Sequence, residues 1–96
     1  EISKFPAVSR DLALLLDANV PFAEVERIAY QAEKKLLKAV KLFDVYEGKN
    51  LPAGKKSYAV NFILQDETKT LNDKAIDAVM QRLIKSLTEQ LGAELR

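Results

Sequence analysis

The chain has 96 residues, of which 48% are hydrophobic and 30% charged, and its formal net charge is +1. This length suits a single domain around one hydrophobic core, which we expect to span residues 1–96. No apolar run approaches the roughly 20 residues of a membrane-spanning helix, so we expect no membrane partner. The nearly balanced charge gives no general argument for nucleic-acid binding, and such a role must rest on where individual charges lie.

Cysteine and histidine are both absent from the sequence. Their absence excludes disulfides, thiolate nucleophiles, the usual zinc ligands and the commonest general base. We therefore assign no catalytic residue and no metal ligand. The chain begins Glu1-Ile2-Ser3 without an initiator methionine or a leader, which we interpret as a fragment of a longer chain.

The first half of the chain predicts a strand, a helix and a second strand. The run DLALLL, residues 11–16, is apolar and short, as in a buried strand. Pro21 suits a first helical turn, which does not need its missing N–H. A helical stripe follows at Phe22, Val25, Ala29, Ala32 and Leu36, and the outer face is expected to carry Glu24, Arg27, Glu33, Lys34 and Lys38. The alternating segment VKLFDVY, residues 40–46, predicts the second strand.

The stretch GKNLPAGKKS, residues 48–57, nearly matches the phosphate-binding loop of nucleotide-binding proteins. Its spacing differs, because five residues rather than four separate Gly48 from Gly54 and two lysines precede Ser57. The following segment SYAVNFIL, residues 57–64, alternates like a strand, whereas a phosphate loop needs a helix there. We therefore predict a long hairpin connection in which Pro52 and the glycines form turns.

The last third of the chain predicts a second helix and a short strand. TLND, residues 70–73, resembles a helix capping box with Asp in place of Glu. The apolar stripe of this helix is Ile76, Val79, Met80, Leu83, Leu87 and Leu91. Gly92 is expected to end the helix in a left-handed conformation, before a last strand in residues 93–96. The resulting order, βαββαβ, predicts a ferredoxin-like α+β sandwich: a four-stranded antiparallel sheet with two helices on one face.

Alternation along the strands divides their residues between the core and the sheet face that the helices leave open. The core set is Leu12, Leu14, Leu16, Phe43, Val45, Tyr58, Val60, Phe62, Leu64 and Leu95. The open set is Asp11, Ala13, Asp44, Tyr46, Ser57, Ala59, Asn61, Glu94 and Arg96. The open set combines an aromatic ring, polar groups and small residues, which suits an unstacked RNA base. A polar face without any partner is an equally good interpretation of this pattern alone.

Four blocks of sequence carry a family resemblance. They are FPAVSRDLALLLD at the start, LFDVYEG in the middle, LPAGKKSYA after the loop, and TLNDKAID with the ending GAELR. In this combination and order, the chain resembles the ferredoxin-fold anticodon-binding domain at the C-terminus of the bacterial phenylalanyl-tRNA synthetase beta subunit. The resemblance covers residues 5–96.

This resemblance implies a tRNA-binding module that reads the anticodon of phenylalanine tRNA on the open sheet face. The fragment itself would have no catalytic activity and no cofactor. Its parent would be a cytoplasmic class II aminoacyl-tRNA synthetase of protein biosynthesis, a ligase that attaches phenylalanine to tRNA with ATP and magnesium. Further partners would be the remainder of the beta chain and the alpha subunit, in a heterotetramer of two alpha and two beta chains.

The RNA-binding residues implied by the resemblance are Asp44, Tyr46, Ser57 and Arg96, with Arg10, Asp11 and Ala13 nearby. Tyr46 would stack on the guanine at the first anticodon position, and Asp44 would accept hydrogen bonds from its donor edge. Ser57 would bond a neighbouring base, and Arg96 a phosphate or a base. Some family members carry an aromatic residue where this chain has Ala93, which cannot stack.

Two other functions are possible for a chain of this fold. A small enzyme of ferredoxin-like fold would have to rely on carboxylates alone. A regulatory or protein-interaction module of the same fold would be expected to carry larger apolar residues on its open face. Lys49, Lys55 and Lys56 in the loop either meet the tRNA backbone or are simply solvated.

Overall fold

The order of secondary-structure elements is the predicted one. The computed structural model describes residues 5–96, so residues 1–4 of the predicted domain lie outside the described part. The elements are β1 (Val8–Asp17), α1 (Phe22–Ala32), β2 (Leu37–Tyr46), β3 (Lys55–Leu64), α2 (Asp73–Leu91) and β4 (Glu94–Leu95). The strands β1, β2 and β3 are longer than predicted.

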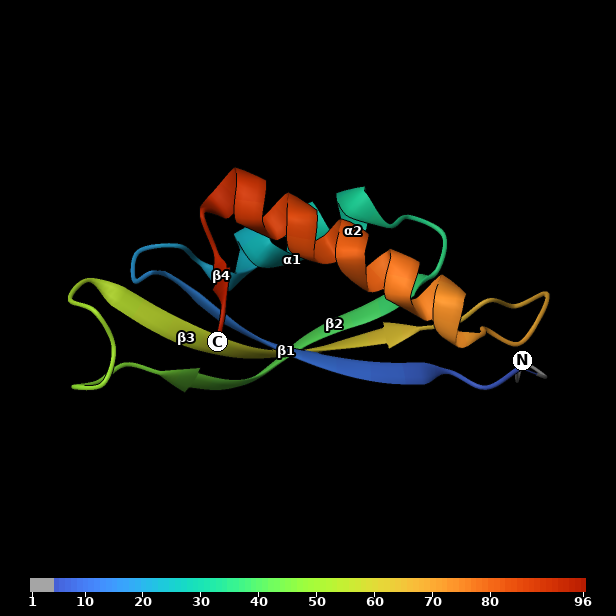
Figure 1. The fold of residues 1–96 in the computed structure, drawn as a ribbon, viewed down its shortest axis with the longest axis horizontal. Helices are drawn as coiled ribbons and strands as arrows, with labels where there is room; N and C mark the ends of the chain where they lie inside the picture. Colours follow the sequence, from blue (N-terminus) through green and yellow to red (C-terminus); the bar gives the residue numbers. More distant parts are fainter. Residues whose placement is uncertain (1–4) are drawn as a thin grey trace.

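The four strands form one antiparallel sheet in the order β2-β3-β1-β4. Both helices lie on the same side of this sheet, and within residues 5–96 no helix or strand covers the other side (Figure 1). The predicted ferredoxin-like α+β architecture is therefore confirmed. The outer strands are β2 and β4, and the central strands are β1 and β3.

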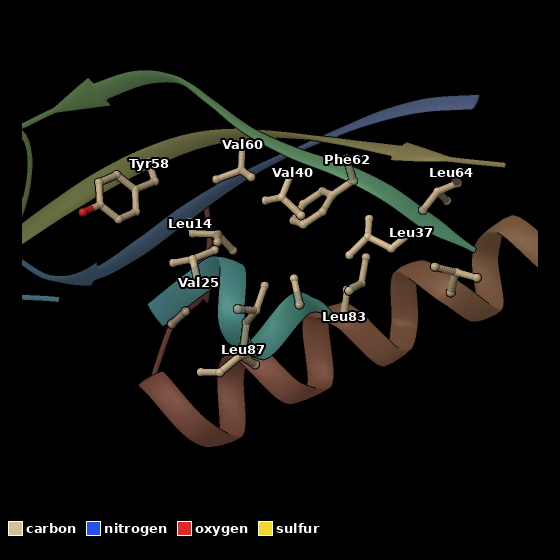
Figure 2. Packing of buried hydrophobic residues seen from close by; sticks show 14 of the residues in the cluster. Leu14, Val25, Leu37, Val40, Tyr58, Val60, Phe62, Leu64, Leu83 and Leu87 are labelled. Carbon is tan, nitrogen blue, oxygen red and sulfur yellow. The ribbon is translucent and has the colours of Figure 1, made fainter. Parts of the chain in front are cut away.

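The core lies between the helices and one face of the sheet. Figure 2 shows four alternate side chains of β3 pointing toward the helices, and all four are at most 4% exposed: Tyr58, Val60, Phe62 and Leu64. The Tyr58 ring also makes an edge-on contact with Phe22 of α1, with 5.6 Å between ring centroids. Its hydroxyl donates to the Val20 carbonyl oxygen at 2.8 Å, so this polar group is buried with a partner.

Helix α1 ends earlier than its apolar stripe predicted. The backbone of Glu33 is extended at the C-cap, so Leu36, Lys34 and Lys38 lie beyond the helix. The Glu33 carboxylate accepts the Leu36 backbone N–H at 3.1 Å and forms an ion pair with Arg82 of α2. The expected outward position of Glu33 is therefore wrong, because its side chain is buried between the two helices.

Burial alone raises the pKa of the Glu33 carboxyl. The hydrogen bonds from Arg82 and from the Leu36 N–H favour the charged form and outweigh this effect, so the pKa lies below its ordinary value. The charged carboxylate therefore ties the end of α1 to the middle of α2.

The N-cap of helix α2 lies two residues after the predicted one. The N-cap is Asn72, whose Oδ1 accepts the Ala75 N–H at 2.8 Å, so the predicted capping box starting at Thr70 is wrong. At the other end, Gly92 has a φ of 66° and its N–H donates to the Thr88 carbonyl oxygen at 3.0 Å. The predicted glycine stop is confirmed.

Three residues assigned to the core are exposed. Phe43 is 59%, Val45 47% and Leu95 51% exposed. In β2 the register shifts between Leu42 and Asp44, so Phe43 is an extra residue at a β-bulge and has no partner in β3. Val45 and Leu95 pair with the core residues Tyr58 and Leu14, but they lie on the outer strands. Figure 1 shows the hairpin end of β2 extending beyond the helices. Val45 is the last residue but one of this strand.

Candidate nucleic-acid interface

The open sheet face carries a hollow of about 370 Å³. We call it the open-face hollow; it is lined by Ala13, Asp44, Tyr46, Asn50, Ser57, Ala59 and Arg96. Five of the seven predicted RNA-binding residues are among them, and they come from β1, β2, β3 and the end of the chain. Residues that are far apart in the sequence thus meet at one place on the face that alternation left open.

The register of the sheet explains this convergence. Ala59 in β3 pairs with Ala13 on one side and with Asp44 on the other, so the three residues form a row across the sheet. The next row toward the hairpin contains Ser57 paired with Tyr46. The two methyl groups leave space between the polar groups, which allows a flat ligand to approach the backbone closely.

Tyr46 is held between a glycine and an arginine. A Cβ at position 48 would lie 2.7 Å from the Tyr46 hydroxyl oxygen, so the ring occupies space that only glycine leaves open. The Arg96 guanidinium lies 5.8 Å from the ring centroid, within the range of a cation–π contact. Arg96 is itself fixed by its backbone N–H, which donates to the Ala13 carbonyl oxygen at 2.9 Å. The ring remains 40% exposed and available for stacking.

The open-face hollow contains both charge signs. Asp44 supplies a carboxylate that only accepts hydrogen bonds, and Arg96 supplies a guanidinium that only donates them. Ser57 is buried at the base of the hollow and supplies a hydroxyl. With an aromatic ring beside them, these groups can bind a planar polar ligand by its edge and its face.

Arg10 and Asp11 do not line the open-face hollow. Asp11 lies on the open face further along β1, where Asn61 Nδ2 donates to its Oδ1 at 2.7 Å. Arg10 pairs with the core residue Phe62, which places it on the side of the sheet that the helices cover. Its guanidinium donates to the Ser9 carbonyl oxygen at 2.9 Å.

Asn50 lines the hollow although the sequence analysis did not select it. It lies in the hairpin loop, in a turn closed by the Leu51 N–H donating to the Gly48 carbonyl oxygen at 3.1 Å. The strand periodicity that assigned the other residues does not extend into a loop. Only its position in the sequence could have indicated Asn50 as a site residue. The loop follows β2 directly after the open-face residue Tyr46, and loops at strand ends often carry binding residues.

Of the three lysines expected in the loop, Lys55 and Lys56 lie at the start of β3, and both interact within the chain. Lys55 Nζ is 2.9 Å from Asp17 Oδ1, and this hydrogen bond raises the pKa of Lys55. Lys56 Nζ lies 4.6 Å from the centroid of the Tyr58 ring. Lys49 lies in the same turn as Asn50 and is exposed.

Within residues 5–96, no three acidic, histidine or cysteine side chains come together as metal ligands. The open-face hollow itself contains one carboxylate, that of Asp44. In the same range, no helix combines the length and apolar character needed to cross a membrane.

The fold and the open-face hollow together define a small α+β domain of the ferredoxin-like class with a hollow on its uncovered sheet face. The chain belongs to the ferredoxin-fold anticodon-binding domain family, whose model matches residues 3–96.

Curated relatives carry one common description. The chain is 73% identical to the phenylalanine–tRNA ligase beta subunit of Bacteroides thetaiotaomicron and 62% identical to that of Porphyromonas gingivalis. The identity to the Haemophilus ducreyi beta subunit is 46%. Each match covers the whole chain but only 12% of the relative. The family resemblance predicted from the sequence is therefore confirmed.

A solved structure shares the fold. A hydantoinase/carbamoylase family amidase from Burkholderia ambifaria matches with a TM-score of 0.52 and 15% identity, over 94% of this chain and 26% of the amidase chain. At this identity the match supports the fold alone.

Proposed function

We propose that this chain is the anticodon-binding module of a phenylalanine–tRNA ligase beta subunit and that the open-face hollow receives an anticodon base of phenylalanine tRNA. The family and the described relatives support this assignment. The observation that carries it is the convergence of Asp44, Tyr46 and Arg96 with two alanines in one hollow of about 370 Å³. Single-stranded bases are recognised by such a combination of stacking and edge contacts.

Each residue has a distinct part in this proposal. Tyr46 stacks on the guanine at the first anticodon position, and the Asp44 carboxylate accepts hydrogen bonds from the guanine N1 and N2 donors. Asp44 also discourages a phosphate from occupying the hollow. Arg96 keeps the Tyr46 ring in place and attracts the RNA backbone, while Ser57 bonds a neighbouring base. Asp11, held by Asn61, and Arg10 would act outside the hollow.

The activity of the longer protein is part of the same proposal, since the chain spans 12% of the first relatives. That protein would be a cytoplasmic class II enzyme that attaches phenylalanine to tRNA with ATP and magnesium, and this module would not take part in the chemistry. It would work as a heterotetramer of two alpha and two beta chains. The descriptions of the relatives support this assignment.

Exposed apolar side chains favour a second role in protein contact. Phe43, Val45 and Leu95 lie on the outer strands, away from the hollow. We propose that these residues face the remainder of the beta chain or the alpha subunit. Such contacts leave the open-face hollow accessible to RNA.

Titration with anticodon stem-loops tests the proposed function. The wild-type chain is titrated at low salt with a fluorescently labelled phenylalanine anticodon stem-loop and with one whose first anticodon guanine is replaced by adenine. We expect tighter binding of the guanine stem-loop. Equal weak binding of both would mean that the chain contributes only sequence-independent electrostatics, and the base-reading function would be rejected.

A further inference from the structure

We propose that Asn50 is a specificity-determining residue of the open-face hollow: its side-chain amide donates a hydrogen bond to the acceptor edge of the bound base. This inference rests on the proposed function, because it requires a base in the hollow. It also gives the hairpin loop, residues 47–54, a second role as one side of the binding site. The sequence predicted turns there and, through its lysines, either contact with the tRNA backbone or simple solvation.

The loop is fixed both internally and to its neighbours. Two turns are closed by backbone hydrogen bonds. The Leu51 N–H donates to the Gly48 carbonyl oxygen at 3.1 Å, and the Lys55 N–H donates to the Pro52 carbonyl oxygen at 3.2 Å. Outside the loop, the Ala18 N–H donates to the Gly54 carbonyl oxygen at 2.8 Å. The connection between β1 and α1 thus holds the end of the hairpin, and the Lys55 ion pair with Asp17 strengthens this attachment.

The start of the loop is attached to the binding site itself. Gly48 lies directly against the Tyr46 ring, close enough that a Cβ at position 48 would be 2.9 Å from the ring atom Cζ. The turn that begins at Gly48 carries Asn50 to the edge of the open-face hollow. Asn50 is therefore positioned before any ligand binds, which reduces the entropic cost of a contact made by a loop residue.

The chemistry of the other lining groups leaves a donor unassigned. The Asp44 carboxylate can only accept, so it serves the N1 and N2 donors of a guanine and not its O6 or N7 acceptors. In the proposed function the Arg96 guanidinium, 5.8 Å from the Tyr46 ring centroid, serves the ring and the RNA backbone, and the Ser57 hydroxyl serves a neighbouring base. Within residues 5–96, the Asn50 amide has no hydrogen-bond partner although it lines the hollow.

An amide offers two N–H donors, and Asn50 is the donor of the open-face hollow to which the proposed function has given no partner, so it is available for an exposed acceptor edge. A base that is bonded by Asp44 on its donor edge and by Asn50 on its acceptor edge is recognised from two sides. Guanine satisfies both groups. Adenine has an amino group in place of O6 and an acceptor at N1, so it satisfies neither group in the same orientation.

Two substitutions at Asn50 distinguish the effect of its N–H donors from the effect of its side-chain size. Asn50→Ala removes the amide, and Asn50→Asp keeps the size and an acceptor but removes both donors. We expect each variant to lower the ratio of guanine to adenine stem-loop affinity by about threefold to tenfold, the range of one hydrogen bond. Lys49→Ala, in the same turn, is the matched control and should keep the wild-type ratio. Urea unfolding should show wild-type stability for all three variants, because these side chains are exposed.

The possible outcomes distinguish this inference from the proposed function. A wild-type chain that prefers guanine, together with Asn50 variants that keep the same ratio, would overturn the role of Asn50 and leave the proposed function intact. Equal losses on both stem-loops would place Asn50 on the ribose or phosphate and overturn base reading by this residue. A wild-type chain without preference would reject the proposed function itself.

Discussion

The two faces of β3 show how one strand serves two purposes. On the covered face, Tyr58, Val60 and Phe62 are almost completely buried against the helices. On the open face, Ser57 and Ala59 alternate with them and line the open-face hollow. Neighbouring residues of the same strand should therefore respond to substitution in opposite ways, since one set contributes to folding and the other to binding.

The largest expected effect is on the covered face. Phe62→Ala removes a fully buried ring from the centre of the core and should lower the free energy of unfolding by about 3–5 kcal/mol. Urea unfolding measures this loss. Asp44→Ala is the control from the open face, and it should change the unfolding free energy by less than about 0.5 kcal/mol while it weakens RNA binding. A comparable loss of stability in both variants would contradict the division between the faces.

A smaller effect on stability, also on the covered side, depends on pH. The pKa of Glu33 lies below its ordinary value of 4.5, so its charged form stabilises the fold above that pH, and this contribution is lost as pH falls through the folded-state pKa. Glu33→Gln should cost about 1 kcal/mol at pH 7, since Arg82 is half exposed and water screens the pair.

The difference in unfolding free energy between wild type and Glu33→Gln should be smaller at pH 3 than at pH 7, because the Glu33 carboxylate loses its charge as pH falls through its lowered folded-state pKa. Urea unfolding at both pH values measures this difference. An equal difference at pH 3 and pH 7 would show that the ion pair with Arg82 is not its source. RNA affinity at pH 7 should be the same for both proteins, because Glu33 lies on the side away from the open-face hollow.

The next prediction concerns the support of Tyr46. Gly48→Ala should weaken guanine stem-loop binding about threefold, because the new methyl group displaces the ring from its position beside Arg96. Stability should change little, since the contact is with the far end of a side chain that can move. Gly54→Ala is not a suitable control because Gly54 has a φ of 78°. Unchanged affinity of Gly48→Ala would mean that ring position does not matter.

The smallest expected effect is electrostatic. Lys49→Ala should reduce the slope of log affinity against log salt concentration by about 0.7, the contribution of one phosphate contact to a single strand. Lys55→Ala should have less influence on this slope, because Lys55 is already paired with Asp17. Titrations at several salt concentrations measure both slopes. An unchanged slope for Lys49→Ala would remove the hairpin loop from the path of the RNA backbone.

The sequence was sufficient where periodicity and pairing act together. The alternation of β3 was predicted in full, and antiparallel register then brought Ala13, Asp44 and Tyr46 to one face. Periodicity was not sufficient where a single residue interrupts it. Phe43 is an extra residue in β2, so it shifts the pairing of β2 with β3 by one residue. A bulge of this kind cannot be recognised from hydrophobic alternation.

Two further errors have local physical causes. Leu36 was expected in α1 because it continues the helical spacing of apolar residues. It lies beyond the helix instead, and its N–H donates to the Glu33 carboxylate in the turn that ends α1. Thr70 looked like a helix cap, but Asn72 supplies the oxygen that accepts the Ala75 N–H. Asn50 lies in a loop, where contacts to neighbouring segments determine position and no repeat exists to predict it.

Two tyrosines of similar exposure allow the most direct test of base reading by the open-face hollow. Tyr46 is 40% exposed and lines the hollow, whereas Tyr30 is 39% exposed and lies on α1. The affinity of Tyr46→Ala and Tyr30→Ala for the guanine stem-loop is measured by fluorescence anisotropy. We predict a loss of about 1–3 kcal/mol for Tyr46→Ala, the value of one base stacked on an aromatic ring, and no loss for Tyr30→Ala. Equal affinity of the two variants would contradict the assignment of the open-face hollow as the base-binding site.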